Sequence, residues 1–313
     1  MTYYRGDGVA RPDIRLPAPP PWRTFPRTTR ATAFQPPAGL TEAVNAALAL
    51  RRPLLITGGP GTGKSTVVEQ VATELDLGPV LRWHITSRST LGDALYRYDA
   101  LGRIHAHRLQ QAGARPGQEG GADAVEDFLT LGQLGTALLP APRPRALLID
   151  EIDKADLDLP GDLLDVLERG EFHIPELLRE GQDAAQVRMW DTAERHLVRD
   201  GRVQCSEFPF IVMTSNGEQD MPAPLLRRCV RFTMPQPDAE LVRRVVRAHL
   251  DLDVGDEGPA AAVVDDFVRR VAAGGSVAVD QLLNALHLLN GTVRGHDEQQ
   301  RVVELLLKDL SSA

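Results

Sequence analysis

The 313-residue sequence is poor in cysteine and in long apolar runs, and each shortage excludes a class of protein. Its two cysteines, Cys205 and Cys229, stand far apart without a C-x-x-C spacing, which argues against a disulfide framework or a zinc site. No apolar run approaches the roughly 20 residues of a membrane span, and the N-terminus lacks the apolar core of a secretory signal. We therefore expect a cytoplasmic protein with reduced thiols.

The sequence also lacks an excess of basic residues. Its formal net charge of −8 weighs against a general nucleic-acid binder, because such proteins need positive charge to hold phosphate backbones. The first 40 residues are the exception, with six arginines against Asp7 and Asp13. The composition of this Pro-rich arm fits both docking on an acidic surface and a solvated extension without a partner.

Lysine is the scarcest basic residue, at positions 64, 154 and 308 among 35 Lys and Arg residues. One of the three lies in "GGPGTGKST", which fits the phosphate-loop pattern G-x-x-x-x-G-K-[ST] from Gly58 to Ser65. A compact ammonium can reach between phosphate oxygens where a planar guanidinium fits less well. The apolar strand pattern before the loop and the helix pattern after it support a nucleotide site.

Each position of the loop has an expected role. Gly58 and Gly63 permit the backbone turns that point amides at an anion, and Lys64 reaches the β- and γ-phosphates. The Ser65 hydroxyl is placed to bind Mg²⁺, and Thr66 extends the start of the helix. The remaining loop residues expected to line the nucleotide are Gly59, Pro60, Gly61 and Thr62.

Two further strands carry polar residues at their ends. "RALLIDE" places Asp150 where it can hold Mg²⁺ through water, and Glu151 where it can polarise an attacking water. Asn216 ends the apolar strand "FPFIVMTSN", and its neutral amide can orient that water beside the γ-phosphate. Asp150 and Glu151 also argue against a small-molecule kinase, whose nucleophile arrives on its substrate.

Arg227 and Arg228 follow a proline-opened turn of helix in "PAPLLRRCVRF". They fit an arginine finger that reaches a neighbouring subunit's γ-phosphate, and they equally fit two surface arginines in an Arg-rich chain.

The chain is organised as an α/β protein. A Pro/Arg-rich arm (1–38) precedes an αβα nucleotide-binding domain (39–235) and a helical lid domain (236–313). Two insertions are expected, at 87–131, with a mobile Gly-rich part at 112–123, and a hairpin at 171–205. Apolar strands separated by helices predict a parallel five-stranded sheet covered on both faces, with strands at 53–58, 80–87, 145–151, 208–216 and 229–234.

With these motifs in this order, the chain resembles AAA+ ATPases, and more narrowly the MoxR-like group, over about residues 34–290. The resemblance rests on "GGPGTGKST", "LLIDEIDKADLDLPGDLLDVLERGEFHIPEL" and "TSNGEQDMPAPLLRRCVRF". It implies that Glu151 is the general base, Asn216 the first sensor, and Arg228, then Arg227, the finger. It implies ATP and Mg²⁺ as cofactors, since no N-K-x-D guanine motif is present.

The same resemblance implies a ring homo-oligomer, commonly a hexamer, that acts as a chaperone or remodelling factor. It implies an unidentified client and, often, a von Willebrand factor A-type partner, contacted through 87–123 or 171–205. Two departures stand out. Val279 and Asp280 replace the second-sensor arginine of the lid, and "DEID" leaves Asp153 and Lys154 as an expected salt-linked pair.

These motifs bear on four possible functions. An ATP-driven remodelling motor is favoured by Glu151, Asn216 and Arg228. A nucleotide-gated scaffold with slow turnover is favoured by the missing lid arginine. A P-loop kinase leaves the Asp150–Glu151 pair and the lid unexplained, and a DNA-translocating ring is weakened by the acidic net charge.

Overall fold

The computed structural model describes residues 6–10, 13, 15–24, 34–111, 124–181, 183–255, 257–275, 277–291 and 296–308. These residues form two compact units. The sheet unit comprises Leu40–Thr57 and Val71–Phe232, and the lid unit comprises Met1–Gly39, Gly58–Gln70 and Thr233–Ala313. The phosphate loop is thus grouped with the lid helices, although it follows a strand of the sheet unit directly in the chain.

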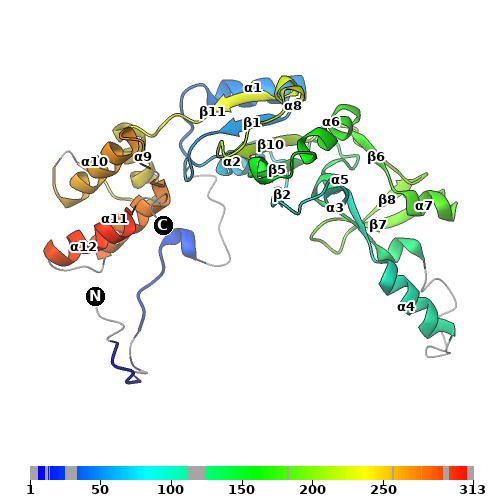
Figure 1. Ribbon diagram of the computed structural model, residues 1–313, viewed down its shortest axis with the longest axis horizontal. Helices are drawn as coiled ribbons and strands as arrows, with labels where there is room; N and C mark the ends of the chain where they lie inside the picture. Colours follow the sequence, from blue (N-terminus) through cyan, green and yellow to red (C-terminus); the bar gives the residue numbers. More distant parts are fainter. Residues whose placement is uncertain are drawn as a thin grey trace. The chain divides into compact units, whose positions relative to one another are not determined.

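The sheet unit contains a five-stranded sheet, here sheet A, in the order β11-β1-β10-β5-β2 (Figure 1). The pairs β1–β10, β10–β5 and β5–β2 are parallel. Its strands are β1 (Leu54–Thr57), β2 (Leu81–His84), β5 (Ala146–Asp150), β10 (Phe210–Ser215) and β11 (Val230–Thr233). The predicted α/β class with a parallel five-stranded sheet is confirmed.

The central strands of sheet A are apolar along their whole length. All six residues of β10 are buried, as are the first four of β5 and the first three of β1. Continuous burial is typical of a parallel strand covered on both faces, and it leaves the strand ends as the places where polar groups can reach solvent. Parallel pairing brings the carboxyl ends of β1, β10 and β5 to one edge of the sheet.

A second sheet of six strands, here sheet B, has the order β3-β4-β7-β8-β9-β6. Its strands are β3 (Tyr96–Tyr98), β4 (Leu129–Leu131), β6 (Glu171–His173), β7 (Ala184–Arg188), β8 (Arg195–Arg199) and β9 (Arg202–Gln204). Buried and exposed residues alternate along β7, β8 and β9, so one face of the sheet packs on the core and the other faces solvent.

The strands of sheet B come from the two ranges that the sequence analysis describes as insertions, 87–131 and 171–205. The antiparallel hairpin β7–β8 lies within the predicted range 171–205, and the tip between the two strands contains Trp190. The strands β3 and β4 were not predicted, because each has only three residues and its partner is distant in sequence. The stretch 112–123, expected to be mobile, lies outside the described residues.

Helices complete the sheet unit. They are α1 (Leu40–Leu50), α3 (Leu91–Leu95), α4 (Ala100–Gln111), α5 (Gln133–Ala137), α6 (Leu159–Arg169), α7 (Pro175–Glu180) and α8 (Ala223–Arg228), with 3-10 helices η3 (Val125–Phe128) and η4 (Ile152–Lys154). Helix α2 (Thr66–Glu74) follows the phosphate loop. One buried cluster joins β5 and β10 of sheet A to β4, β7 and β8 of sheet B, so both sheets share a core.

The lid unit contains four C-terminal helices, within the range 236–313 expected to form a helical lid domain. They are α9 (Ala239–Leu250), α10 (Pro259–Ala272), α11 (Val279–Gly291) and α12 (His296–Leu306). Their shared core includes Phe267, Leu282 and Leu286, all fully buried. Asp238 caps α9, because its carboxylate accepts a hydrogen bond from the amide of Leu241 (2.7 Å).

The arm contributes one side chain to that same core. Trp22, in the 3-10 helix η1 (Pro21–Arg23), is only 9% exposed and packs within the lid cluster. Its indole N–H donates to Asn284 Oδ1 (3.1 Å), and its ring lies edge-on to His287 with centroids 5.9 Å apart. The arm therefore has a packed partner in the lid, rather than being solvated throughout.

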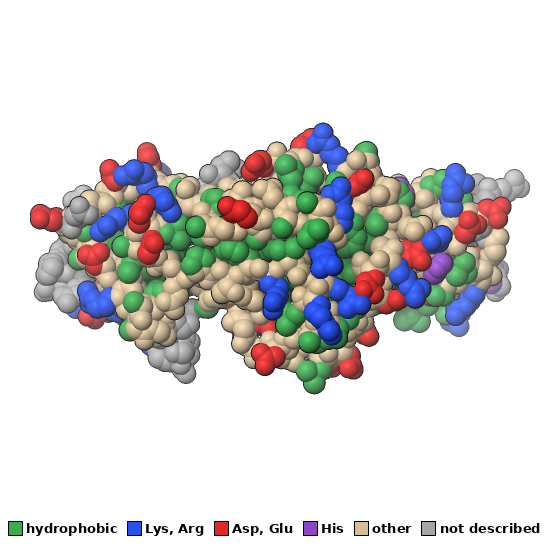
Figure 2. Space-filling model, turned by 90° about the horizontal axis from the view of Figure 1, so that it is seen from above, with side chains coloured by type: hydrophobic (Ala, Val, Ile, Leu, Met, Phe, Trp, Pro, Cys, Tyr) green, Lys and Arg blue, Asp and Glu red, His purple; other side chains and the backbone are tan. Residues whose placement is uncertain are grey.

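On the face drawn in Figure 2, Lys and Arg side chains (blue) and Asp and Glu side chains (red) are interspersed. Such mixing lets neighbouring charges of opposite sign pair, and exposed pairs of this kind occur at Arg51–Glu207 and Arg169–Asp165. None of the helices in the described ranges combines the length and apolar character that a membrane crossing requires.

Candidate functional site

The carboxyl ends of β5 and β10 bring the predicted acidic and amide residues together. Thr214, a buried residue of β10, links the two strands, because its hydroxyl donates to Asp150 Oδ1 (2.6 Å). The amide of Glu151 in turn donates to Thr214 Oγ1 (2.9 Å). The hydroxyl holds Asp150 and Glu151 at the edge of the sheet, a role that the sequence did not reveal, since Thr214 reads as one more member of an apolar strand.

Glu151 leaves the strand in an unusual backbone conformation. Its φ of 61° lies in the left-handed region, which costs a non-glycine residue about 1 kcal/mol or more. The turn directs its carboxylate to Asn216, whose side-chain Nδ2 lies 3.4 Å from Glu151 Oε1. The structure thus brings together Asp150, Glu151 and Asn216, three residues that are 66 positions apart at most in the sequence.

The expected Asp153–Lys154 salt link is wrong. Lys154 Nζ instead donates to Glu151 Oε2 at 2.8 Å, and this hydrogen bond is the main reason that the pKa of Lys154 is raised. Asp153 is only 3% exposed, and its Oδ2 accepts from the amides of Asn216 (2.8 Å) and Glu218 (3.0 Å). The 3-10 helix η4 explains why Lys154 pairs with Glu151, because residues three positions apart lie on one face of such a helix.

Asp153 therefore has a structural role that differs from the predicted one. By accepting two backbone amides just after β10, it fixes the turn that carries Asn216. This places the amide of Asn216 relative to Glu151 through the main chain. The two backbone donors stabilise Oδ2 of this buried carboxylate through charge-assisted hydrogen bonds.

His84 is a site residue that the sequence reasoning left out. It ends β2 directly opposite Asp150 in the parallel register, and its Nε2 lies 3.6 Å from Glu151 Oε2. Its Nδ1 lies 4.0 Å from Asp150 Oδ2, and its side chain is 63% exposed. The available signal was its place at the end of a predicted strand beside the one carrying the acidic pair.

The phosphate loop is held by hydrogen bonds from its own lysine side chain. Lys64 is 7% exposed, and its Nζ donates to the carbonyls of Gly58 (2.7 Å) and Gly59 (2.8 Å). The lysine thus bends back over the loop that a phosphate group would occupy. Its ammonium can exchange these carbonyls for phosphate oxygens without moving its stem far.

Two glycines of the loop are required by their surroundings. Gly61 has a φ of 71°, and a Cβ placed there would lie 2.5 Å from the Cβ of Ala278. Gly63 has a φ of 83°, and a Cβ there would lie 3.0 Å from the ring of Phe34. Both the conformation and the close packing exclude larger residues.

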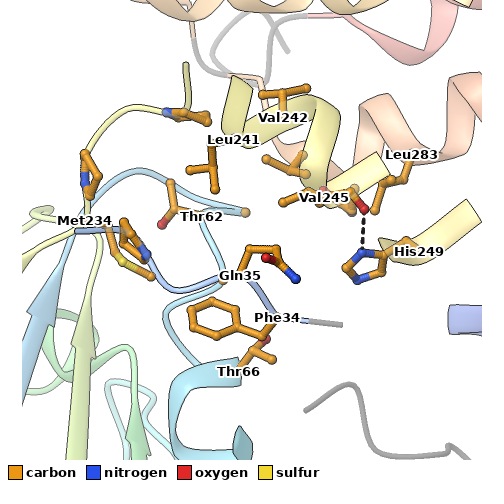
Figure 3. Close-up of a pocket in the computed structure, with 17 residues that line it drawn as sticks. Phe34, Gln35, Thr62, Thr66, Met234, Leu241, Val242, Val245, His249 and Leu283 are labelled. Carbon is orange, nitrogen blue, oxygen red and sulfur yellow. Dashed lines mark hydrogen bonds between the residues drawn. The ribbon is translucent and has the colours of Figure 1, made fainter. Parts of the chain in front are cut away.

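Beside the loop, the lid unit contains a pocket, here called the lid pocket (Figure 3). Phe34 and Gln35 lie on one side and Leu241, Val242 and Val245 of α9 lie on the other. It is lined by Phe34, Gln35, Pro37, Gly61, Thr62, Gly63, Thr66, Met234, Pro235, Pro237, Leu241, Val242, Val245, His249, Val279, Asp280 and Leu283. A mostly apolar hollow with a few polar groups is typical of small-molecule sites.

Polar groups in the lid pocket are few. His249 Nδ1 donates to the carbonyl of Val245 (2.9 Å), as the dashed line in Figure 3 marks, so its Nε2 is the nitrogen left to face a ligand. Val279 and Asp280, the residues at the expected second-sensor place, also line the pocket. The lid thus contributes an apolar and an acidic side chain at the expected second-sensor position, in place of an arginine.

The two finger candidates lie at the end of α8. Arg228 donates from Nε to Glu168 Oε1 and from Nη1 to the carbonyl of Pro224 (3.2 Å). Arg227 is exposed, and its carbonyl accepts from Arg52 Nη1 (3.2 Å). The side chain of Arg228 remains 41% exposed, so the ion pair with Glu168 keeps it at the surface.

A known protein family matches the part of the chain that contains the phosphate loop, Asp150, Glu151 and Asn216. The profile of the family described as AAA domain (dynein-related subfamily) matches residues 53–229. An ATP-dependent protease ATP-binding subunit-like protein of Rhodococcus erythropolis is 34% identical over 123 residues. This match covers 39% of the chain and only 30% of the length of that relative.

Two solved structures from Thermotoga maritima are also similar. Domain III of the replication initiation protein DnaA is 17% identical with a TM-score of 0.44, covering 90% of this chain and 98% of that one. The RuvB Holliday junction branch migration motor is 12% identical with a TM-score of 0.40, covering 85% of this chain and 66% of that one.

Proposed function

Because this chain belongs to the AAA domain family, dynein-related subfamily, we propose that it hydrolyses ATP within a ring oligomer and remodels or activates a partner protein. The observation that carries the proposal is the meeting of Asp150, Glu151 and Asn216 at the carboxyl edge of sheet A. The strand β1 ends at the same edge, where Thr57 pairs with Ser215, and the phosphate loop follows Thr57 in the chain.

The residue types present suit a magnesium nucleotide. Ser65 and Asp150 offer the hydroxyl and carboxylate oxygens that Mg²⁺ prefers, and Lys64 offers a mobile positive charge. The lid pocket offers apolar walls for a flat ring, with His249 as a polar contact. When bound, Mg²⁺ would supply charge neutralisation for the phosphates.

In this proposal the chain's own residues manage the attacking water. Glu151 accepts its proton, and Asn216 orients it through the side-chain amide. Glu151 Oε2 also accepts a hydrogen bond from the Lys154 ammonium, which stabilises the charged carboxylate and so opposes proton transfer to it from the water. Arg228, with Arg227 second, would complete the site of a neighbouring subunit after leaving Glu168.

A second candidate is a nucleotide-gated scaffold with slow turnover. Two observations favour it: the Lys154–Glu151 hydrogen bond, and the presence of Val279 and Asp280 in the lid pocket in place of an arginine. Both would slow hydrolysis without preventing nucleotide binding. For the first candidate, the remodelling ATPase, we also propose a cytoplasmic location, a hexameric ring and a von Willebrand factor A-type partner.

The test is the specific ATPase rate of the purified protein over a wide range of protein concentration, with Glu151→Gln as the blank. We expect the rate per chain to rise with concentration, because a finger supplied in trans completes sites only in the oligomer. Glu151→Gln should lower the rate by about 100-fold or more while a fluorescent ATP analogue still binds, since it removes the base and keeps the shape.

Mixing variants sharpens the result. Arg228→Ala and Glu151→Gln chains, each inactive alone, should regain part of the rate when mixed, because mixed oligomers contain some complete sites. A concentration-independent rate close to the blank supports the scaffold instead. Undiminished hydrolysis by Glu151→Gln would show that the base is another residue.

A further inference from the structure

We propose that the exposed face of sheet B binds an acidic protein segment that presents an apolar side chain between carboxylates. The inference deepens the proposed function and rests on it, since it identifies the chemistry of the client that a remodelling ATPase would engage. The binding surface, here called the arginine face, consists of Arg97, Arg188, Arg195, Arg199 and Arg202 around Leu197.

Strand register places these arginines on one face. Arg188 of β7 pairs directly with Arg195 of β8, and Arg199 of β8 pairs directly with Arg202 of β9. Thr130 of β4 connects the row, because it is opposite Arg188 on one side and Arg97 of β3 on the other. Residues that are directly opposite across neighbouring strands point to the same face, so five guanidinium groups share it.

The opposite face of the same strands is apolar and buried. Ala185 and Val187 of β7, Val198 of β8 and Val203 of β9 all lie in the core of the sheet unit. The arginine face therefore cannot turn inward without exposing this core. It is presented to solvent as a fixed surface by strands whose register is set by the buried residues.

The face carries more positive charge than its own acidic neighbours offset. Arg195 pairs with Asp127 (2.9 Å), Arg202 with Glu171, and Arg97 with Asp93 (3.7 Å). Within the described part of the chain, Arg188 and Arg199 form no ion pair. Like charges directly opposite each other in a sheet are destabilising, so these two arginines are costly to the fold unless a partner uses them.

The centre of the face indicates the partner's chemistry. Leu197 is 39% exposed, and Arg195 and Arg199 flank it two residues away on each side of the same strand. An extended segment with a central leucine and carboxylates two residues to either side has the matching spacing, since every second residue shares a face. Guanidinium groups also bind carboxylates in bidentate fashion.

A nucleic acid suits the face less well. Proteins that bind single strands on a sheet stack bases on several aromatic rings. None of the described outward-facing strand residues of sheet B is Phe, Tyr or Trp, and the nearby ring of Trp190 already lies 5.8 Å from the guanidinium of Arg97. An acidic polypeptide needs only the charges and the leucine.

The experiment measures binding of a fluorescein-labelled peptide containing two Glu-Thr-Leu-Thr-Glu units to the full chain, without nucleotide, by fluorescence anisotropy. We expect wild-type protein to bind it, more weakly as salt rises from about 50 to about 300 mM. Arg188→Glu/Arg199→Glu should weaken binding about tenfold or more, because it replaces attraction by repulsion at the two unpaired arginines. A peptide with serine in place of leucine should bind several-fold more weakly.

The matched control is Arg169→Glu/Arg244→Glu, which makes the same charge change on exposed arginines of α6 and α9. It should bind the peptide like wild type. Thermal unfolding checks that both double variants fold, and Arg188→Gln/Arg199→Gln replaces the reversal if that variant unfolds. The proposal fails if wild type does not bind, if the control loses as much affinity as the test variant, or if a single-stranded oligonucleotide binds this face more tightly than the peptide.

A change of assembly state on charge reversal, with no peptide binding, would also overturn the proposal, since it would make the face a contact between copies. ATPase activity is measured separately on the same preparations. If the protein binds the peptide but does not hydrolyse ATP, the proposal for the arginine face stands and the proposed motor function fails. If it hydrolyses ATP but does not bind the peptide, the motor function stands and the proposal for the arginine face fails.

Discussion

Sheets A and B share one hydrophobic core but expose their functional groups in opposite ways. The central strands of sheet A, β5 and β10, are buried along their length and present polar groups where they end, at Asp150, Glu151 and Asn216. Sheet B buries alternate residues and shows polar groups along its strands, as Arg195 and Arg199 of β8 do. The parallel sheet concentrates chemistry at one edge, while the half-exposed sheet spreads charge over an area.

This difference separates two kinds of specificity. An edge gathers few groups, each held by neighbours at hydrogen-bond distance, as Thr214 holds both Asp150 and the Glu151 amide. The exposed face of sheet B carries more charged groups with fewer neighbours to hold them, which suits a partner recognised by the spacing of its charges. Substitutions in sheet A should accordingly affect stability and hydrolysis, and those on the outer face of sheet B should affect binding.

The largest contrast is expected in stability. Leu147→Ala, at a fully buried position of β5, should lower the free energy of unfolding by about 2–5 kcal/mol, because it leaves a cavity in the shared core. Leu197→Ala, on the exposed face of β8, should cost less than about 1 kcal/mol. Urea unfolding of both variants measures the difference, and equal losses would contradict the contrast between the buried strands of sheet A and the exposed face of sheet B.

A smaller effect is expected at the edge itself. Lys154→Gln removes the hydrogen bond to Glu151 Oε2 and should raise the basal ATPase rate by about 1.4–5-fold, the range that one partly exposed ion pair supports. Lys154→Arg keeps a cation there and serves as the matched control. A lower rate in Lys154→Gln that Lys154→Arg restores would show that the lysine supports Glu151 rather than restraining it.

The smallest effect is expected on the arginine face. Arg199→Thr removes one of two directly opposed arginines and should raise the free energy of unfolding by about 0.2–0.5 kcal/mol at low salt. Gln186→Thr is the control, because Gln186 faces uncharged Leu197 on the same sheet. The advantage of Arg199→Thr over this control should shrink at high salt as the repulsion is screened. A salt-independent difference would point to strand propensity instead.

The sequence was sufficient to predict the centre of sheet A, because β1, β5 and β10 are continuous apolar runs that end in recognisable motifs. Asp150, Glu151 and Asn216 follow such runs directly, so their positions at strand ends could be read without coordinates. The short strands β3 and β4 escaped prediction, because three residues carry too little periodicity and their pairing is decided by contacts far along the chain.

Side-chain partners were harder to predict than strands. Lys154 and Asp153 are neighbours in sequence, yet the turn of η4 sends the lysine to Glu151 and the aspartate to two backbone amides. The lid pocket was missed for a related reason. Phe34 and His249 are 215 positions apart, and only tertiary packing brings them to one hollow.

The burial of Trp22 in the lid has a consequence for how pieces of this chain can be exchanged. The indole fills a place in the lid core and its N–H satisfies Asn284, so the lid is complete only with a segment from the other end of the chain. A chimera that received α9 to α12 of this chain would have an unfilled place in the lid core unless it also received residues 15–24. Residues 15–24 and the lid helices α9 to α12 therefore have to be exchanged together.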